Sequence, residues 1–248
     1  LTVTNLEVLG GWGNSVVFDQ EGGYHFATPL WISAGGGEYD LHGGQLGGTV
    51  LMKGGVLNQY GGDLSVADFV VDGFYNLYGG TFETAGDLTD NQGFVTQSGG
   101  AASAGSLFIG ATSISGFPPT FGSYILTNGT LNIATNAIIS YEGNLDQEGG
   151  TINIAGAFNI NDDYVGPSPG YSIWGTFTNN GGMFSAGSIN LAGKIAQTGG
   201  TNQVLGDLTV TDGPGDYILS GGLLSTANTL KSSGAFHQLG GVHSVQNL

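Results

Sequence analysis

The dipeptide Gly-Gly recurs along the chain at nearly even steps, each time after a short stretch of alternating apolar and polar residues. The first glycines of these pairs are at positions 22, 43, 61, 79, 99, 149, 181, 199, 221 and 240, and Asn128-Gly129 occupies the one vacant slot. Most steps are about 18 to 22 residues, and wider steps mark two insertions. Such a repeat predicts an all-β fold, a single-stranded parallel β-solenoid that forms one continuous domain over 1–248.

The repeat at 56–73 shows how one coil is expected to fold. It contains three short strand-like stretches separated by three corners. Alternation of side chains places Asn58 and Tyr60 on the outer face. The inward positions are Leu57, Gln59, Leu64, Val66, Phe69 and Val71. We expect about eleven such rungs in a triangular coil, wound right-handed as is commoner among β-helices, so that the inward residues form continuous buried columns.

The position two residues before each Gly-Gly alternates between Gln and an apolar residue, mostly Leu, from coil to coil. The glutamines are Gln20, Gln59, Gln97, Gln147, Gln197 and Gln238. We interpret a pair of coils as the repeating unit. Because a buried amide needs hydrogen-bond partners, we predict that these side chains bind the adjacent Gly-Gly corner rather than line a ligand groove. Asn128 is predicted to take a left-handed backbone conformation in its glycine slot.

Charge argues against several classes of function. Only 9% of the residues are charged, and 19 acidic residues against 3 basic ones give a formal net charge of −16. Nucleic acids and anionic membrane surfaces need a cationic footprint, so neither is an expected partner. The chain has no cysteine and no apolar run long enough for a transmembrane segment. These features favour an extracellular or bacterial cell-surface location, without a cofactor.

The two ends of the sequence fall in mid-coil. Residues 242–248 match the register of 1–6, and neither end has the polar or helical cap that closes many solenoids. We therefore hypothesise either a segment of a longer chain or a protomer that self-associates, end to end or side by side, into a filament.

The stretches Tyr217–Gly222 and Ile195–Thr201 resemble the Tyr-x-Leu-x-Gly-Gly and Phe-x-Gln-x-Gly-Gly-Thr repeats of large bacterial exported and surface proteins. Those proteins include autotransporter-like β-solenoids and the glycine-rich repeat regions associated with PEP-CTERM sorting signals. The resemblance covers essentially the whole chain. It implies a parallel β-solenoid, export from the cell, and a structural, adhesive or biofilm-matrix role.

The two insertions, 110–122 and 161–171, are predicted to leave the same corner of the coil two rungs apart. Aromatic and acidic residues in such loops suit a sugar-stacking patch, a calcium site or a contact with a neighbouring rod, although they also suit simple coverage of apolar surface. The candidate contact residues there are Phe117, Phe121, Asp162, Asp163, Tyr164 and Tyr171. Tyr60 and Tyr78 should stack on the outer face, where they either bind a glycan or only stabilise the coil.

Catalysis is not expected. Lys53, Lys194 and Lys231 are far apart in rung number, which disfavours a polysaccharide lyase. The acidic pairs Asp19/Glu21 and Asp146/Glu148 lie on the outer face of one strand, without the opposed carboxylates of a hydrolase.

The histidines, His25, His42, His237 and His243, occupy unrelated positions, so isolated surface side chains and no metal site are expected. The sequence thus favours a non-catalytic extracellular structural protein that forms a filament, matrix or adhesive rod. A carbohydrate-binding solenoid with surface glycans as partners is the alternative, and a β-helix polysaccharide hydrolase ranks third.

Overall fold

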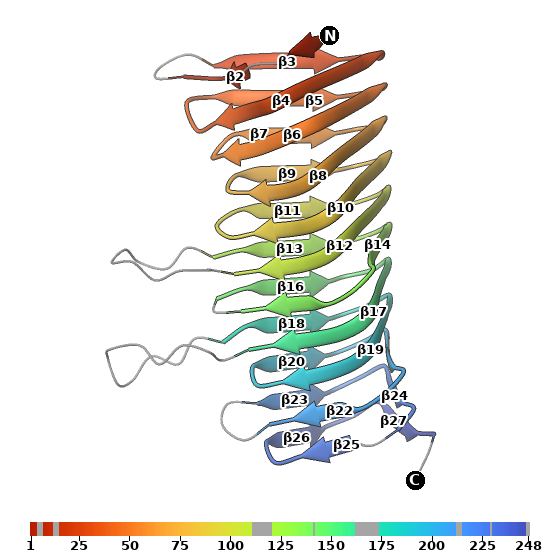
Figure 1. Cartoon of the computed structure of the whole chain (residues 1–248). Helices are drawn as coiled ribbons and strands as arrows, with labels where there is room; N and C mark the ends of the chain where they lie inside the picture. Colours follow the sequence, from red (N-terminus) through yellow and green to blue (C-terminus); the bar gives the residue numbers. More distant parts are fainter. Residues whose placement is uncertain are drawn as a thin grey trace, which may run out of the picture.

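The computed structural model describes residues 1–3, 7–11, 15–110, 121–140, 142–161, 174–211, 215–228 and 230–246. These residues form strands without any helix. Neighbouring strands from successive turns pair in parallel, and they stack into a β-solenoid of about ten turns with the two chain ends at opposite ends of the stack (Figure 1). The predicted parallel β-solenoid is confirmed. Its handedness, triangular outline and exact number of rungs stay predictions.

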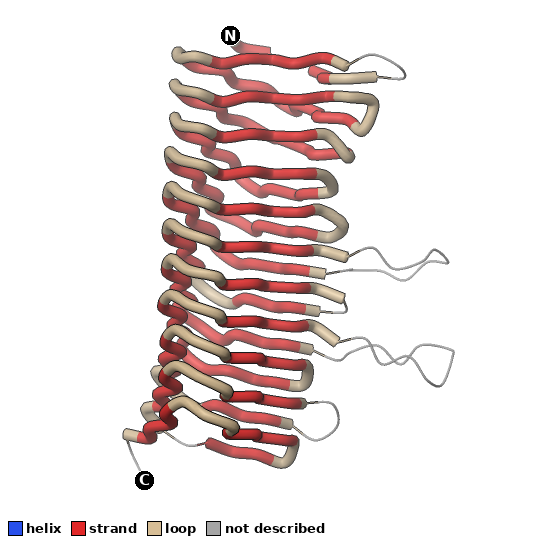
Figure 2. The backbone as a smooth tube through the Cα atoms, turned by 180° about the vertical axis from the view of Figure 1, so that it is seen from behind, coloured by secondary structure: helices blue, strands red, loops and turns tan. Residues whose placement is uncertain are grey.

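One sheet collects the strand that precedes each Gly-Gly corner. Its eleven strands are β3 (Val16–Gln20), β5 (Gly37–Leu41), β7 (Val56–Gln59), β9 (Phe74–Leu77), β11 (Phe94–Gln97), β13 (Ser123–Leu126), β16 (Asn144–Gln147), β18 (Thr176–Asn179), β20 (Lys194–Gln197), β23 (Asp216–Leu219) and β26 (Ala235–Gln238). Seen from behind, these strands lie one above another along the whole stack (Figure 2).

A second sheet of 16 strands collects the rest of each turn. It contains β1 (Thr2–Val3), β2 (Glu7–Leu9), β4 (Tyr24–Ser33), β6 (Gln45–Lys53), β8 (Asp63–Val71), β10 (Thr81–Asp90), β12 (Ala101–Ile109), β14 (Thr130–Ile133), β15 (Ala137–Ile139), β17 (Thr151–Ile160), β19 (Met183–Leu191), β21 (Thr201–Val204), β22 (Leu208–Val210), β24 (Leu223–Thr226), β25 (Leu230–Ser232) and β27 (Val242–Val245).

The expectation of three separate strands per coil is wrong for many turns. In β4, β6, β8, β10, β12, β17 and β19, the second and third stretches are one strand of nine or ten residues. The predicted corner is instead a bend with a local irregularity, such as the register shift between Thr84 and Asp87 of β10. A β-bulge bends a strand while most of the ladder continues, so the chain needs no loop there.

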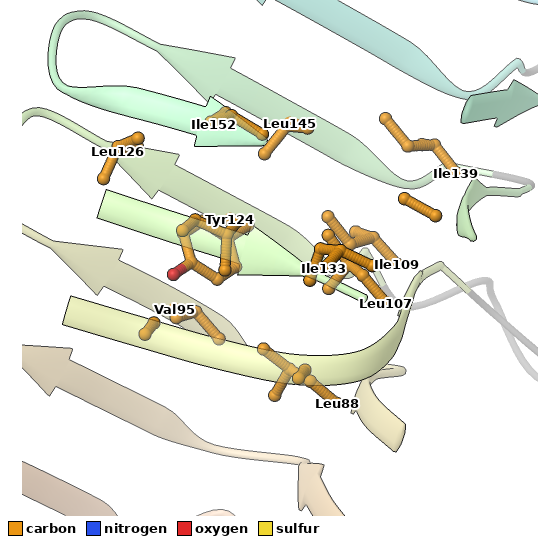
Figure 3. Close-up of a cluster of buried hydrophobic side chains, with 14 of the residues drawn as sticks. Leu88, Val95, Leu107, Ile109, Tyr124, Leu126, Ile133, Ile139, Leu145 and Ile152 are labelled. Carbon is orange, nitrogen blue, oxygen red and sulfur yellow. The ribbon is translucent and has the colours of Figure 1, made fainter. Parts of the chain in front are cut away.

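The inward columns match the sequence expectation. Leu57, Gln59, Leu64, Val66, Phe69 and Val71 are all buried. Figure 3 shows the same packing farther along the stack, where the Tyr124 ring lies among aliphatic side chains that include Val95 and Leu107. The core is therefore a filled column, and each turn buries its apolar face against the turns on either side.

The two glycines of each corner have different physical roles. Gly44, the second of its pair, has a φ of 77°, whereas a Cβ on Gly43, the first, would lie 2.7 Å from the carbonyl oxygen of Glu21 in the preceding turn. The left-handed conformation predicted for Asn128 is wrong, because the positive φ of that corner, 94°, belongs to Gly129. Asn128 occupies the first position, which at Gly43 is limited by close approach to the neighbouring turn rather than by backbone handedness.

Candidate functional site

The buried glutamines tie three elements together inside the solenoid. The Gln59 side-chain amide donates to the carbonyl oxygen of Gly62 at its own corner, at 3.1 Å, and to that of Thr81 in the next turn, at 2.7 Å. The Gln59 carbonyl oxygen accepts a hydrogen bond of 2.7 Å from the Tyr75 hydroxyl. The same Tyr-to-Gln bond joins Tyr39 to Gln20, Tyr124 to Gln97 and Tyr217 to Gln197. The alternation seen in the sequence is thus a donor and acceptor pair split between two turns.

The tyrosines remain donors over the whole physiological pH range. Burial raises the pKa of Tyr75, Tyr124 and Tyr217 well above its ordinary value, and burial followed by the charge of Glu7 does so for Tyr39. A neutral phenol keeps its proton for the glutamine oxygen, so this network does not titrate near neutrality.

One turn breaks the pairing. Phe177 stands where a tyrosine would donate to Gln147, and the side-chain oxygen of Gln147 is buried without a hydrogen-bond partner. We expect Phe177→Tyr to supply that donor and to stabilise the protein by about 1 kcal/mol. Thermal and denaturant unfolding measure the gain. Tyr124→Phe is the matched opposite and should destabilise; equal stability of Phe177→Tyr and wild type would contradict the pairing.

The outer face of the first sheet carries the predicted tyrosine stack. The Tyr60 and Tyr78 rings are 5.0 Å apart at 8°, and His42 lies on the other face of Tyr60 at 4.7 Å. Both tyrosines are about half exposed. Each face of Tyr60 is covered by a ring, which leaves ring edges toward solvent and favours the stabilising interpretation over sugar stacking there. Asn58, predicted to be exposed, is buried beside Glu38 and Asp40, to which its amide donates.

Of the loop candidates, only Phe121 is described, and its side chain is 58% exposed. Phe117, Asp162, Asp163, Tyr164 and Tyr171 lie outside the described residues. The strands that flank the two insertions, β12 and β13 for one and β17 and β18 for the other, make the same type of connection between the two sheets.

The histidine interpretation needs correction. His25 is 2% exposed and bonded, through its two ring nitrogens, to the Tyr39 hydroxyl at 2.7 Å and to Glu7 at 2.9 Å, so it is a core residue. His42 is not isolated either. It lies with Asp19 and Asp40 in a group whose possible metal-ligand atoms are all within 4.8 Å of one another. The parallel register stacks Asp19 on Asp40 and so creates this group.

Sequence reasoning missed Asp90. This residue is fully buried at the end of β10, pairing with Val71 and Ile109 in a column that is otherwise aliphatic. One carboxyl oxygen accepts from the Gly93 amide at 2.8 Å, and the other is buried without a partner. Burial raises the pKa of Asp90 to about 8 against the opposing backbone hydrogen bonds of Gly93 and Ser123, with a smaller upward contribution from Asp72. An acidic residue at an aliphatic repeat position was the available signal.

Comparison of the chain with protein-family models, curated proteins and solved structures finds no match. Within the described part of the chain, no helix has the length and apolar character needed to cross a membrane.

Proposed function

We propose that this chain is a rigid structural rod of an exported filament, matrix or adhesive fibre, and that it has no catalytic role. The observation that supports the proposal most is the direction of its interactions. Side-chain bonds of the Gln–Tyr network run from one turn to the next inside the core, parallel to the backbone ladders of both sheets. Such bonding resists separation of the turns along the axis and shields the backbone from proteases.

Hydrogen bonds between side chains on the outer faces of the sheets also join one turn to the next. Asn76 donates to Asn58 in the preceding turn at 2.9 Å, Asn153 to Asn132 at 2.9 Å, and Thr198 to Asn180 at 2.6 Å. Charged side chains are few and the net charge is −16, so the polar groups of this chain are mostly hydroxyl, amide and acidic groups. This composition suits a protein that stays hydrated outside the cell.

Electron microscopy of the source cells tests the proposal directly. With an antibody against this chain, we expect label on rods or fibres outside the cell, and none in a strain that lacks the gene. Sedimentation of the purified chain over a range of concentrations should show self-association. Label confined to the cell interior, together with a monomer at all concentrations, would overturn the proposal.

A further inference from the structure

A hollow on the outer side of the second sheet, near the start of the chain, is a candidate binding site. Its volume is about 330 Å³, near the lower end of the range for ligand sites, and it is lined from three successive turns. The lining includes the rings of Tyr24 and Phe26 from β4, the buried Gly47 of β6, and the polar side chains of Gln45 and Asp63.

Gly47 differs from the glycines that the fold requires. Its neighbour Gly48 has a φ of 109°, and a Cβ there would lie 1.9 Å from the carbonyl oxygen of Ala27. At Gly47 the φ is not in the left-handed region, and the closest atom to an added Cβ would be the Tyr24 hydroxyl at 3.2 Å, which belongs to an exposed side chain. Glycine is therefore not needed there for the backbone, although it weakens a strand interior.

The absent side chain leaves room into which the Tyr24 hydroxyl and the Phe26 ring extend, so that Gly47 is itself buried beneath the lining of the hollow. In register, Gly47 pairs with Phe26 on one side and Ser65 on the other, and the following turn has Glu83 in the same column. Every one of these neighbours carries a side chain at this outward position. A glycine inside a strand often marks a β-bulge or a place where a ligand or another backbone approaches closely. The register shift of this strand lies between Gly48 and Val50, just beyond Gly47.

The lining specifies the chemistry of the occupant. The Tyr24 and Phe26 rings are 6.1 Å apart at 17° and offer an apolar wall, with Tyr24 51% exposed. Gln45 is the register partner of Tyr24 in the next turn; its amide lies 3.4 Å from one Asp63 oxygen, and Thr81 donates to the other at 2.5 Å. These groups combine C–H packing with donors and acceptors for hydroxyl groups, while the Asp63 carboxylate and the net charge of −16 repel anions.

We propose that this hollow binds one ring of a neutral saccharide, with Tyr24 and Phe26 packing on its C–H face and Gln45 and Asp63 bonding its hydroxyl groups. The site is open to solvent across three turns, which suits a sugar within a polysaccharide chain that crosses the rod. This binding activity is separate from the rod proposed above, and it places saccharide recognition away from the insertions and from Tyr60 and Tyr78.

Calorimetric titration of the full chain with neutral tetrasaccharides of glucose, mannose, galactose and N-acetylglucosamine tests the site. We expect at least one to bind with a Kd on the order of 0.1 to 1 mM, and Gly47→Val and Tyr24→Ala each to weaken it about tenfold or more. Gln203→Val, at the same outward position in a distant turn, is the matched control and should bind as wild type does.

Unfolding midpoints of all three variants show whether loss of binding reflects loss of fold. Tyr24→Ala changes an exposed ring, so it remains informative if Gly47→Val disturbs β6. Absence of binding by all four saccharides, or undiminished binding by both Gly47→Val and Tyr24→Ala, would overturn the site. Neither result tests fibre formation, which electron microscopy measures independently.

Discussion

The free energy of unfolding of the wild-type protein should fall as the pH rises from about 4 to about 8, and Asp90→Asn should remove a large part of that fall. The Asp90 carboxyl has a pKa raised from 3.8 to about 8 in the folded protein, because it is buried in an aliphatic column. Between these two values the unfolded chain has lost this proton while the folded chain retains it, so the free energy of unfolding falls as the pH rises. Above about pH 8 the carboxyl is ionised in both states and its contribution levels off.

The size of this effect follows from the pKa difference. A shift of about four units corresponds to a loss on the order of 5 kcal/mol across the window. Asparagine keeps the oxygen that accepts from Gly93 and carries no charge at any of these pH values. The variant should therefore match wild type near pH 4 and exceed its stability near pH 9.

Denaturant unfolding at a series of pH values measures the difference. Other carboxylates also titrate in both variants and in the wild type. The control variant is therefore Asp87→Asn, which removes a carboxylate from an exposed position on the same strand. Parallel stability curves for wild type and Asp90→Asn would show that Asp90 does not titrate in this window.

Gln97→Met is expected to destabilise the protein by about 2 to 4 kcal/mol. The substitution preserves most of the side-chain volume but leaves the buried Tyr124 hydroxyl without its acceptor and removes the bonds to the carbonyl oxygens of Gly100 and Thr130. An unpaired hydroxyl in the core costs more than the bond itself contributed.

The last glutamine of the series provides the control for this substitution. Gln238 is exposed and bonds only to the Gly241 carbonyl oxygen in the described structure, so Gln238→Met should change stability by less than about 1 kcal/mol. Thermal unfolding of both variants compares a buried glutamine that has a tyrosine partner with an exposed glutamine for which the described structure shows none. Equal losses would show that the tyrosine partner is unimportant.

Local sequence pattern was sufficient to predict the fold and the orientation of most side chains. A period of two distinguishes the buried Leu57 from the exposed Tyr60, and a period of about 20 residues brings equivalent positions into one column. The bond from Gln59 to its own glycine corner was also predictable, because both groups lie within a few residues of one another.

Features that depend on contact between turns were harder to foresee. The Tyr75-to-Gln59 bond joins two turns, so predicting it requires knowing how closely the turns stack. The buried state of His25 likewise depends on Glu7 and Tyr39 from neighbouring turns. The role of Asn128 was misjudged for the same reason, since the limiting contact at first glycine positions is a carbonyl group of the previous turn. The hollow at Gly47 results from what its neighbours carry, which a single repeat does not reveal.

Glutamine turns and tyrosine turns alternate along the solenoid, so removing an even number of turns preserves the alternation and removing an odd number breaks it. Deleting residues 74–93 would remove one turn and stack Gln59 directly beneath Gln97, with no tyrosine between them. Deleting 56–93 would remove two turns and place Gln97 after Leu41, which restores the alternation. A rod of this design can therefore grow or shorten in even steps at little energetic penalty, whereas an odd step leaves a fault in its core.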